Sequence, residues 1–142
     1  MGVLYDYFAA PSDELAAATI DGGPVGLFRT VETKSLDPVV VMGMLEELLT
    51  GRLYDDIADD PRCGHDLAIE DDGEVLVLTV TDGLRDGLAE ADDLVGIAVA
   101  WARIEELEGF DPVVLADILQ SLQALAVEAA KNGERLYCWA SV

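Results

Sequence analysis

The strongest constraint on the fold is a long amphipathic segment close to the C-terminus. Asp111 and Pro112 begin this segment, supplying a carboxylate for free backbone amides and a proline at the first helical position. Gly133 ends it, because glycine adopts the left-handed cap conformation without steric cost. One stripe holds the apolar residues Leu115, Ile118, Leu119, Leu122, Leu125, Ala126 and Ala129. We therefore expect a helix over 111–132 and a terminal strand over 135–141.

The start of this helix has a near-copy earlier in the chain. Residues 36–41 (LDPVVV) resemble residues 110–115 (FDPVVL), and the apolar positions that follow keep the same helical phase. This similarity favours an internal duplication with repeat units 1–72 and 73–142. The alternative is convergence, because Asp-Pro is a common way to begin a helix.

Each half is predicted to run strand, short helix, strand, longer helix, strand. The expected elements are 2–9, 12–19, 25–32, 37–50 and 66–70 in the first half, then 74–81, 83–91, 95–103, 111–132 and 135–141 in the second. Asp72-Gly73 between two apolar runs predicts a hairpin.

Two segments of this scheme need comment. Bulky and small residues alternate from Val95 to Ala102, which indicates a strand, although a helix over 98–107 is the alternative. Residues 50–65 have weak periodicity and are expected to form a loop with a helical turn at 53–58. The glycines at Gly83 and Gly87 are interpreted as turn residues.

Length and composition fit one domain spanning residues 1–142. The chain has 142 residues, of which 51% are hydrophobic and 26% charged, so it can bury a core and is not disordered. The fold class expected is α/β or α+β, with a mixed sheet of about six strands carrying helices and a pseudo-twofold relation between the halves.

The charge balance excludes several classes of partner. Lys and Arg number 8 against 29 Asp and Glu, giving a formal net charge of -21. Such a surface repels nucleic acid and acidic lipid headgroups. The longest uncharged apolar run, 94–102, is much shorter than the ~20 residues of a membrane span. No secretory signal begins the chain, so we expect a cytoplasmic protein without membrane contact.

The large negative net charge allows three interpretations: adaptation to high salt, a face that meets a basic protein partner, or a solvated surface without a specific role. If the second holds, acidic clusters and aromatic residues of predicted strands are the candidate binding residues. These are Asp55, Asp56, Asp59, Asp60, Asp71, Asp72, Tyr5, Tyr7 and Trp139.

Catalytic signatures are weak. Cys63 and His65 lie close to Asp59 and Asp60, but they supply too few ligands for zinc, and the negative surroundings oppose a thiolate. None of the acidic clusters has the spacing of a calcium loop, and no phosphate loop, dinucleotide fingerprint or nucleophile elbow occurs. We therefore assign no catalytic residue, no metal and no cofactor.

Three stretches carry a resemblance to a known family. They are Met1-Gly2 followed by Tyr5, Tyr7 and Phe8; residues 45–51, which include the sequence LLTG; and residues 129–133 (AAKNG) before a terminal strand. In these stretches the chain resembles the YfbM-like family of small proteins of undefined function. Members typically carry Trp and His just ahead of LLTG, where this chain has residues 44–47 (MLEE). The resemblance implies a mixed α and β fold and no particular activity.

The function expected from these features is binding or regulation. An acidic face would meet a basic partner, as in an immunity or inhibitor protein, or the chain would be a homodimer of unknown role. The alternative is a small enzyme or ligand-binding domain that uses carboxylates with Cys63 and His65.

Overall fold

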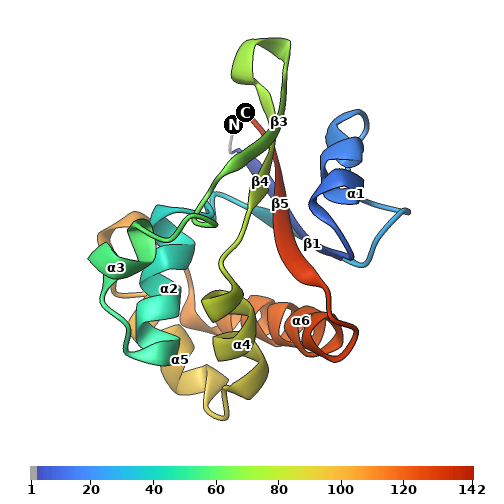
Figure 1. Cartoon of the computed structure of the whole chain (residues 1–142). Helices are drawn as coiled ribbons and strands as arrows, with labels where there is room; N and C mark the ends of the chain where they lie inside the picture. The colour runs from blue at the N-terminus through green and yellow to red at the C-terminus, as the bar shows by residue number, and fades with distance from the viewer. Residues whose placement is uncertain (1–2) are drawn as a thin grey trace.

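The computed structural model describes residues 3–142 and has an α+β architecture (Figure 1). Within that range, five strands form one antiparallel sheet: β1 (Leu4–Ala10), β2 (Thr30–Lys34), β3 (Asp66–Glu70), β4 (Val75–Thr79) and β5 (Arg135–Ser141). The helices are α1 (Asp13–Ala17), α2 (Val40–Thr50), α3 (Tyr54–Ala58), α4 (Asp82–Glu90), α5 (Leu94–Trp101) and α6 (Pro112–Lys131). Short 3-10 turns are η1 (Ala18–Ile20), η2 (Asp71–Gly73) and η3 (Glu105–Leu107).

The sheet is organised around the C-terminal strand. Its order is β2-β1-β5-β4-β3, and every neighbouring pair is antiparallel, so the prediction of a mixed sheet is wrong. The predicted strand over 135–141 is confirmed as β5, which joins β1 to the β3–β4 hairpin. That hairpin is also as predicted, with η2 forming its turn.

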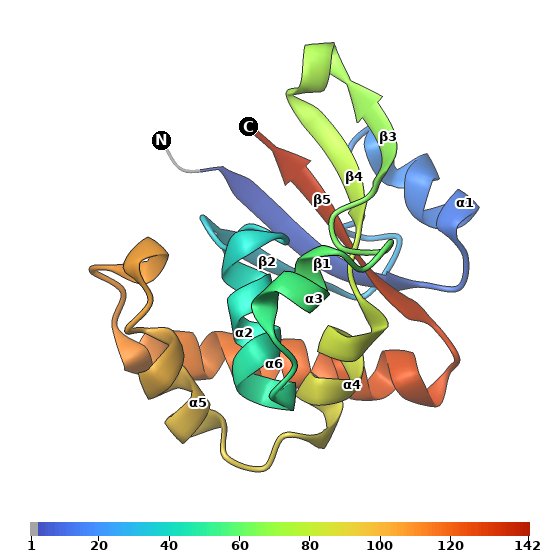
Figure 2. The same cartoon turned by 60° about the vertical axis from the view of Figure 1, so that its left-hand side comes forward.

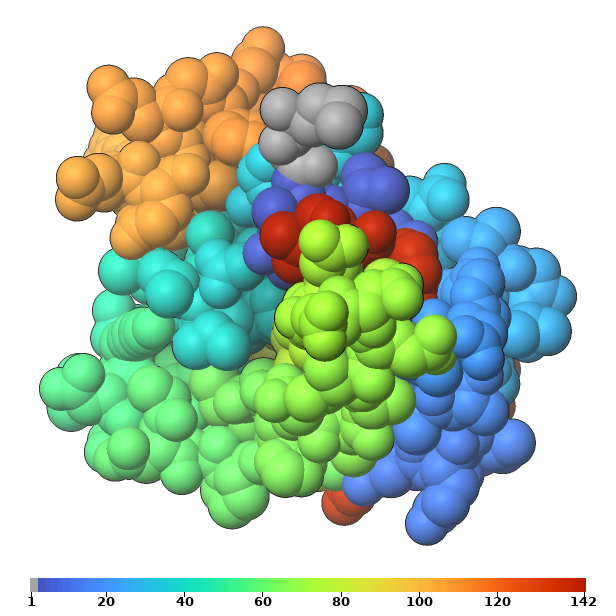
Figure 3. Space-filling model, turned by 90° about the horizontal axis from the view of Figure 1, so that it is seen from above, coloured from blue at the N-terminus to red at the C-terminus, as the bar shows by residue number. Residues whose placement is uncertain are grey.

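The two faces of the sheet carry different layers. Helices α2, α4, α5 and α6 enclose the larger core on one face, and α1 with the loop that follows it covers the other (Figure 2). Viewed from the β3–β4 turn, α1 and the segment around α3 lie on opposite sides of the molecule (Figure 3).

Helix α6 confirms the most constrained sequence prediction. The Asp111 carboxylate accepts a hydrogen bond from the Val113 amide at 2.9 Å, and Gly133 has a φ of 68°. Leu115, Leu119 and Leu122 lie in the core. Among residues 3–142, α6 is also the helix whose length and apolar composition would suit a membrane span, but its buried stripe faces the sheet, as in the core helix of a folded domain.

One strand prediction is wrong, and the sheet therefore has five strands instead of about six. Residues 95–103 were expected to be extended, whereas Leu94–Trp101 forms helix α5, the alternative type of structure. The Trp101 indole is buried and donates to the Val41 carbonyl oxygen at 3.1 Å, while Val95 and Val99, one helical turn apart, are exposed. Alternating bulky and small residues also fit a helix whose small side chains permit close packing.

The first half differs from prediction in smaller ways. The strand expected over 25–32 begins at Thr30, because the preceding loop contains Gly22, Gly23 and Gly26 with positive φ. The helical turn expected over 53–58 is present as α3. Gly83 and Gly87 are helical residues of α4, not turn residues. The internal duplication stays a prediction, although residues 25–27 are loop and the similar residues 95–97 are helix.

Candidate binding groove

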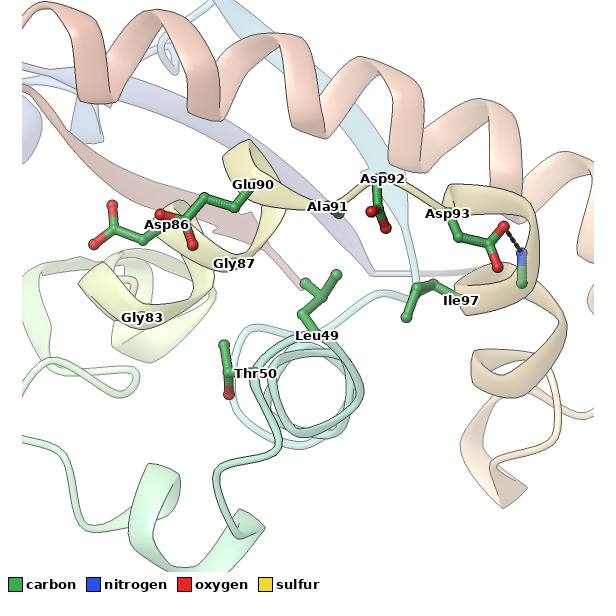
Figure 4. A pocket seen from close by; sticks show the side chains of 11 residues that line it. Leu49, Thr50, Gly83, Asp86, Gly87, Glu90, Ala91, Asp92, Asp93 and Ile97 are labelled. Atoms are coloured by element: carbon green, nitrogen blue, oxygen red, sulfur yellow. Dashed lines mark hydrogen bonds between the residues drawn. The ribbon is translucent and has the colours of Figure 1, made fainter.

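A cavity lies at the helical end of the molecule. It has a volume of about 670 Å³ and lies between the C-terminal end of α2, one side of α4 and the start of α5. Figure 4 shows Asp86, Glu90 and Asp92 along one wall, opposite Leu49 and Thr50 of α2. We call this cavity the α2–α4 groove.

The groove depends on an unusually close approach of two helices. Gly83 and Gly87 are one turn apart on α4 and face α2. A Cβ atom at Gly87 would lie 2.9 Å from Thr50 Cγ2, and one at Gly83 would overlap the Glu46 carboxylate. The absence of side chains at these two positions lets α4 lie directly on α2.

The groove combines an apolar floor with acidic walls. Leu49 and Ile97 contribute apolar surface. The Asp93 carboxylate is occupied as the cap of α5, accepting from the Gly96 amide at 3.0 Å, and Asp86 is paired with Arg85 at 2.9 Å. Among residues 3–142, Glu90 and Asp92 have no Lys or Arg within 4.0 Å. Such a site suits a ligand with an aliphatic part and a positive end.

The few basic residues are mostly neutralised within the chain. Five of the eight have a carboxylate within 4.0 Å: Arg29, Arg52, Arg62, Arg85 and Arg135. The acidic excess is therefore left largely unopposed on the surface.

A buried carboxylate lies behind the groove wall. Glu46 of α2 has a side chain only 2% exposed, accepts a hydrogen bond from the Thr81 hydroxyl, and lies 3.6 Å from Arg52. Its Oε2 atom has no hydrogen-bond partner within residues 3–142. Burial raises the pKa of the Glu46 carboxyl, opposed by the Thr81 and Arg52 interactions. Because Thr81 also caps α4 by accepting from the Leu84 amide at 3.1 Å, Glu46 holds the N-terminus of α4 in place.

Sequence reasoning did not select Glu46. The available signal was its position in the helix predicted over 37–50, where it lies one turn after Met42 on the buried side, next to Leu45. A carboxylate on an apolar helical face indicates a paired or protonated group.

The structure separates the predicted acidic residues into two places. Asp55 and Asp56 are exposed in the first turn of α3, and Asp59 and Asp60 follow it, with Asp60 paired to Arg52 at 3.3 Å. Asp71 and Asp72 form the β3–β4 turn, at the opposite end of the molecule from α4 and α5 (Figure 1). None of these six lines the α2–α4 groove, and their binding role stays a prediction.

The predicted aromatic residues do not form one patch. Tyr7 is buried, and its hydroxyl donates to the Leu36 carbonyl oxygen, so a partner that docks on the folded chain cannot reach it. Tyr5 packs against the larger core on the same face of the sheet. Trp139 packs on the other face, where its indole donates to the Ile20 carbonyl oxygen at 3.2 Å.

The Cys63 segment has the wrong electrostatics for a nucleophile. Burial raises the pKa of the Cys63 thiol, and the nearby Glu46 and Asp60 carboxylates raise it further. The His65 side chain is exposed, while its backbone amide donates to Thr79 Oγ1 at 3.0 Å. In residues 3–142, no three His, Cys, Asp or Glu residues are grouped to hold a metal ion.

Comparisons of the chain with models of protein families, with curated proteins and with solved structures give no match. The resemblance to the YfbM-like family therefore stays a prediction.

Proposed function

We propose that this chain is a non-catalytic binding protein that takes a basic segment of a partner protein into the α2–α4 groove. The observation that carries the proposal is the pair of carboxylates, Glu90 and Asp92, which lie beside an apolar floor and have no Lys or Arg of residues 3–142 within 4.0 Å. Lys and Arg side chains match this arrangement, because their alkyl stems cover apolar surface while their charged ends reach the carboxylates.

The charge of the whole chain supports the same partner. A net charge of -21 attracts a basic protein from a distance and accelerates encounter, whereas contacts in the groove select the bound orientation. The alternative role, an enzyme or ligand-binding site at Cys63 and His65, has less support because burial and the nearby Glu46 and Asp60 carboxylates raise the pKa of the Cys63 thiol.

The experiment compares two charge-matched double variants. Glu90→Gln with Asp92→Asn removes the groove carboxylates, and Asp71→Asn with Asp72→Asn removes the same charge from the β3–β4 turn. The probe is a synthetic peptide of alternating Lys and Leu, with affinity measured by calorimetry at about 0.15 M salt. We expect the groove variant to bind on the order of tenfold more weakly and the turn variant to bind almost as the parent chain does. Equal losses would mean that only total charge matters, which overturns the proposal.

A further inference from the structure

Strand β2 forms a free edge of the sheet whose backbone groups point outward. The Ser35 amide donates to the Val3 carbonyl oxygen at 2.9 Å, so the odd-numbered residues of β2 bond to β1. Glu32 and Lys34 therefore direct their amides and carbonyls away from the sheet. Such an edge is a template for another strand.

The edge carries an uncompensated charge arrangement. Asp6 of β1 lies directly opposite Glu32 in a non-hydrogen-bonded pair, the type of antiparallel pair in which the two side chains are closest. Asp6 is only 8% exposed, and burial together with Glu32 raises its pKa. Within residues 3–142, neither carboxylate has a basic group within 4.0 Å, and Lys34 has no acidic one.

A second copy of the chain would supply the missing cation. If two β2 strands pair antiparallel about a twofold axis at Thr33, Glu32 of each copy lies opposite Lys34 of the other. The outward-facing backbone groups of Glu32 in one copy then exchange hydrogen bonds with those of Lys34 in the other. The other edge behaves differently, because self-pairing of β3 about Ala68 would place Asp66 opposite Glu70 and set like charges against each other.

Apolar surface continues from the same edge. A cavity of about 510 Å³ lies between β2 and the start of α6 and is lined by Leu4, Thr33, Phe110 and Ile118, among others. Val114 of α6 lies one helical turn before Ile118 and is half exposed. Pairing of the edges would bring two such apolar strips together.

We propose that the chain forms a homodimer through its β2 edges, giving a ten-stranded antiparallel sheet in which Glu32 of each copy pairs with Lys34 of the other. The inference is independent of the groove, which lies on other elements.

Charge exchange at these two positions tests the dimer. Lys34→Glu or Glu32→Lys sets like charges opposite each other twice in the symmetric interface, whereas the double variant Glu32→Lys with Lys34→Glu restores both pairs. Lys131→Glu makes the same charge change as Lys34→Glu at an exposed site on α6. Both substituted side chains of β2 are exposed, and circular dichroism checks that each variant is folded.

The measurement is sedimentation equilibrium over a range of protein concentrations, at moderate salt that screens the repulsion between two acidic chains. We expect each single variant to raise the dimer dissociation constant on the order of tenfold or more, and the double variant and Lys131→Glu to stay close to the parent chain. A parent chain that is monomeric at all concentrations would overturn the proposal. A dimer whose dissociation constant does not change in the single variants would also overturn it, because the copies would then meet through another surface. So would a double variant that does not recover the affinity of the parent chain.

Discussion

The close contact between α4 and α2 predicts that substitution of Gly87 by alanine destabilises the chain. An alanine Cβ at this position would lie 2.9 Å from Thr50 Cγ2, which forces a neighbour to move, and 3.2 Å from Leu49 Cβ, which is a tight contact. Gly43 of α2 is the matched control, because its alanine Cβ would meet only the Tyr54 ring, at 3.8 Å. Both glycines are inside helices with ordinary helical backbone.

The magnitude follows from two opposing contributions. Alanine favours a helix over glycine by about 1 kcal/mol at either position. Overpacking costs about 1–3 kcal/mol, and it applies only at Gly87. We therefore expect Gly43→Ala to raise the free energy of unfolding by up to about 1 kcal/mol. Gly87→Ala should lower it by up to about 2 kcal/mol.

Urea unfolding, followed by the fluorescence of Trp101 and Trp139, measures both variants. Thr50→Ser removes the Cγ2 atom but keeps the hydroxyl that donates to the Glu46 carbonyl oxygen at 2.9 Å, so it should restore much of the stability lost in Gly87→Ala. If Gly87→Ala stabilises the chain as much as Gly43→Ala, the helices are not in the contact described and the groove wall is misplaced.

The remaining predictions concern two carboxylates. Burial raises the pKa of the Glu46 carboxyl in the folded chain above its ordinary value of 4.5. The stability that protonated Glu46 contributes is therefore fully present below pH 4.5 and is lost as the pH rises through the pKa of the folded chain. The free energy of unfolding of Glu46→Gln should therefore rise relative to that of the parent chain between pH 4.5 and 7. Urea titrations at each pH measure both values. A difference in the free energy of unfolding that does not change with pH would contradict this. The Tyr137 hydroxyl donates to Asp13 at 2.6 Å and, with Arg62, lowers the pKa of that carboxyl. Tyr137→Phe should cost about 1 kcal/mol at pH 7 and less as the pH falls below 3.8, because the Asp13 contribution is present above its ordinary pKa and is lost in acid. An equal cost at both pH values would count against this assignment.

Features set by neighbouring residues were predictable from the sequence. The cap, the apolar stripe and the final glycine of α6 lie within one segment, as do the turn residues of the β3–β4 hairpin. Interactions between distant segments were not accessible. Trp101 of α5 bonds to the Val41 carbonyl, and an alternating pattern in residues 95–102 does not reveal that partner.

The candidate groove shows the same limit. Its walls come from α2 and α4, whose proximity depends on Gly83 and Gly87 lying on one helical face. Because sequence reasoning interpreted these glycines as turn residues, it did not predict the close contact between α4 and α2 that they allow. The acidic residues that sequence reasoning selected lie on or just after α3 and in the β3–β4 turn, away from the groove, and their binding role stays a prediction.

The most direct test of the account is a methyl NMR titration with the Lys-Leu peptide. Ile97 lines the groove together with Glu90 and Asp92, whereas Ile69 is 55% exposed next to the acidic β3–β4 turn. Binding in the groove predicts saturable shifts of the Ile97 and Leu49 methyl groups while Ile69 stays nearly unchanged. Comparable shifts at Ile69, or none at Ile97, would show that the peptide follows overall charge and that the groove is not a binding site.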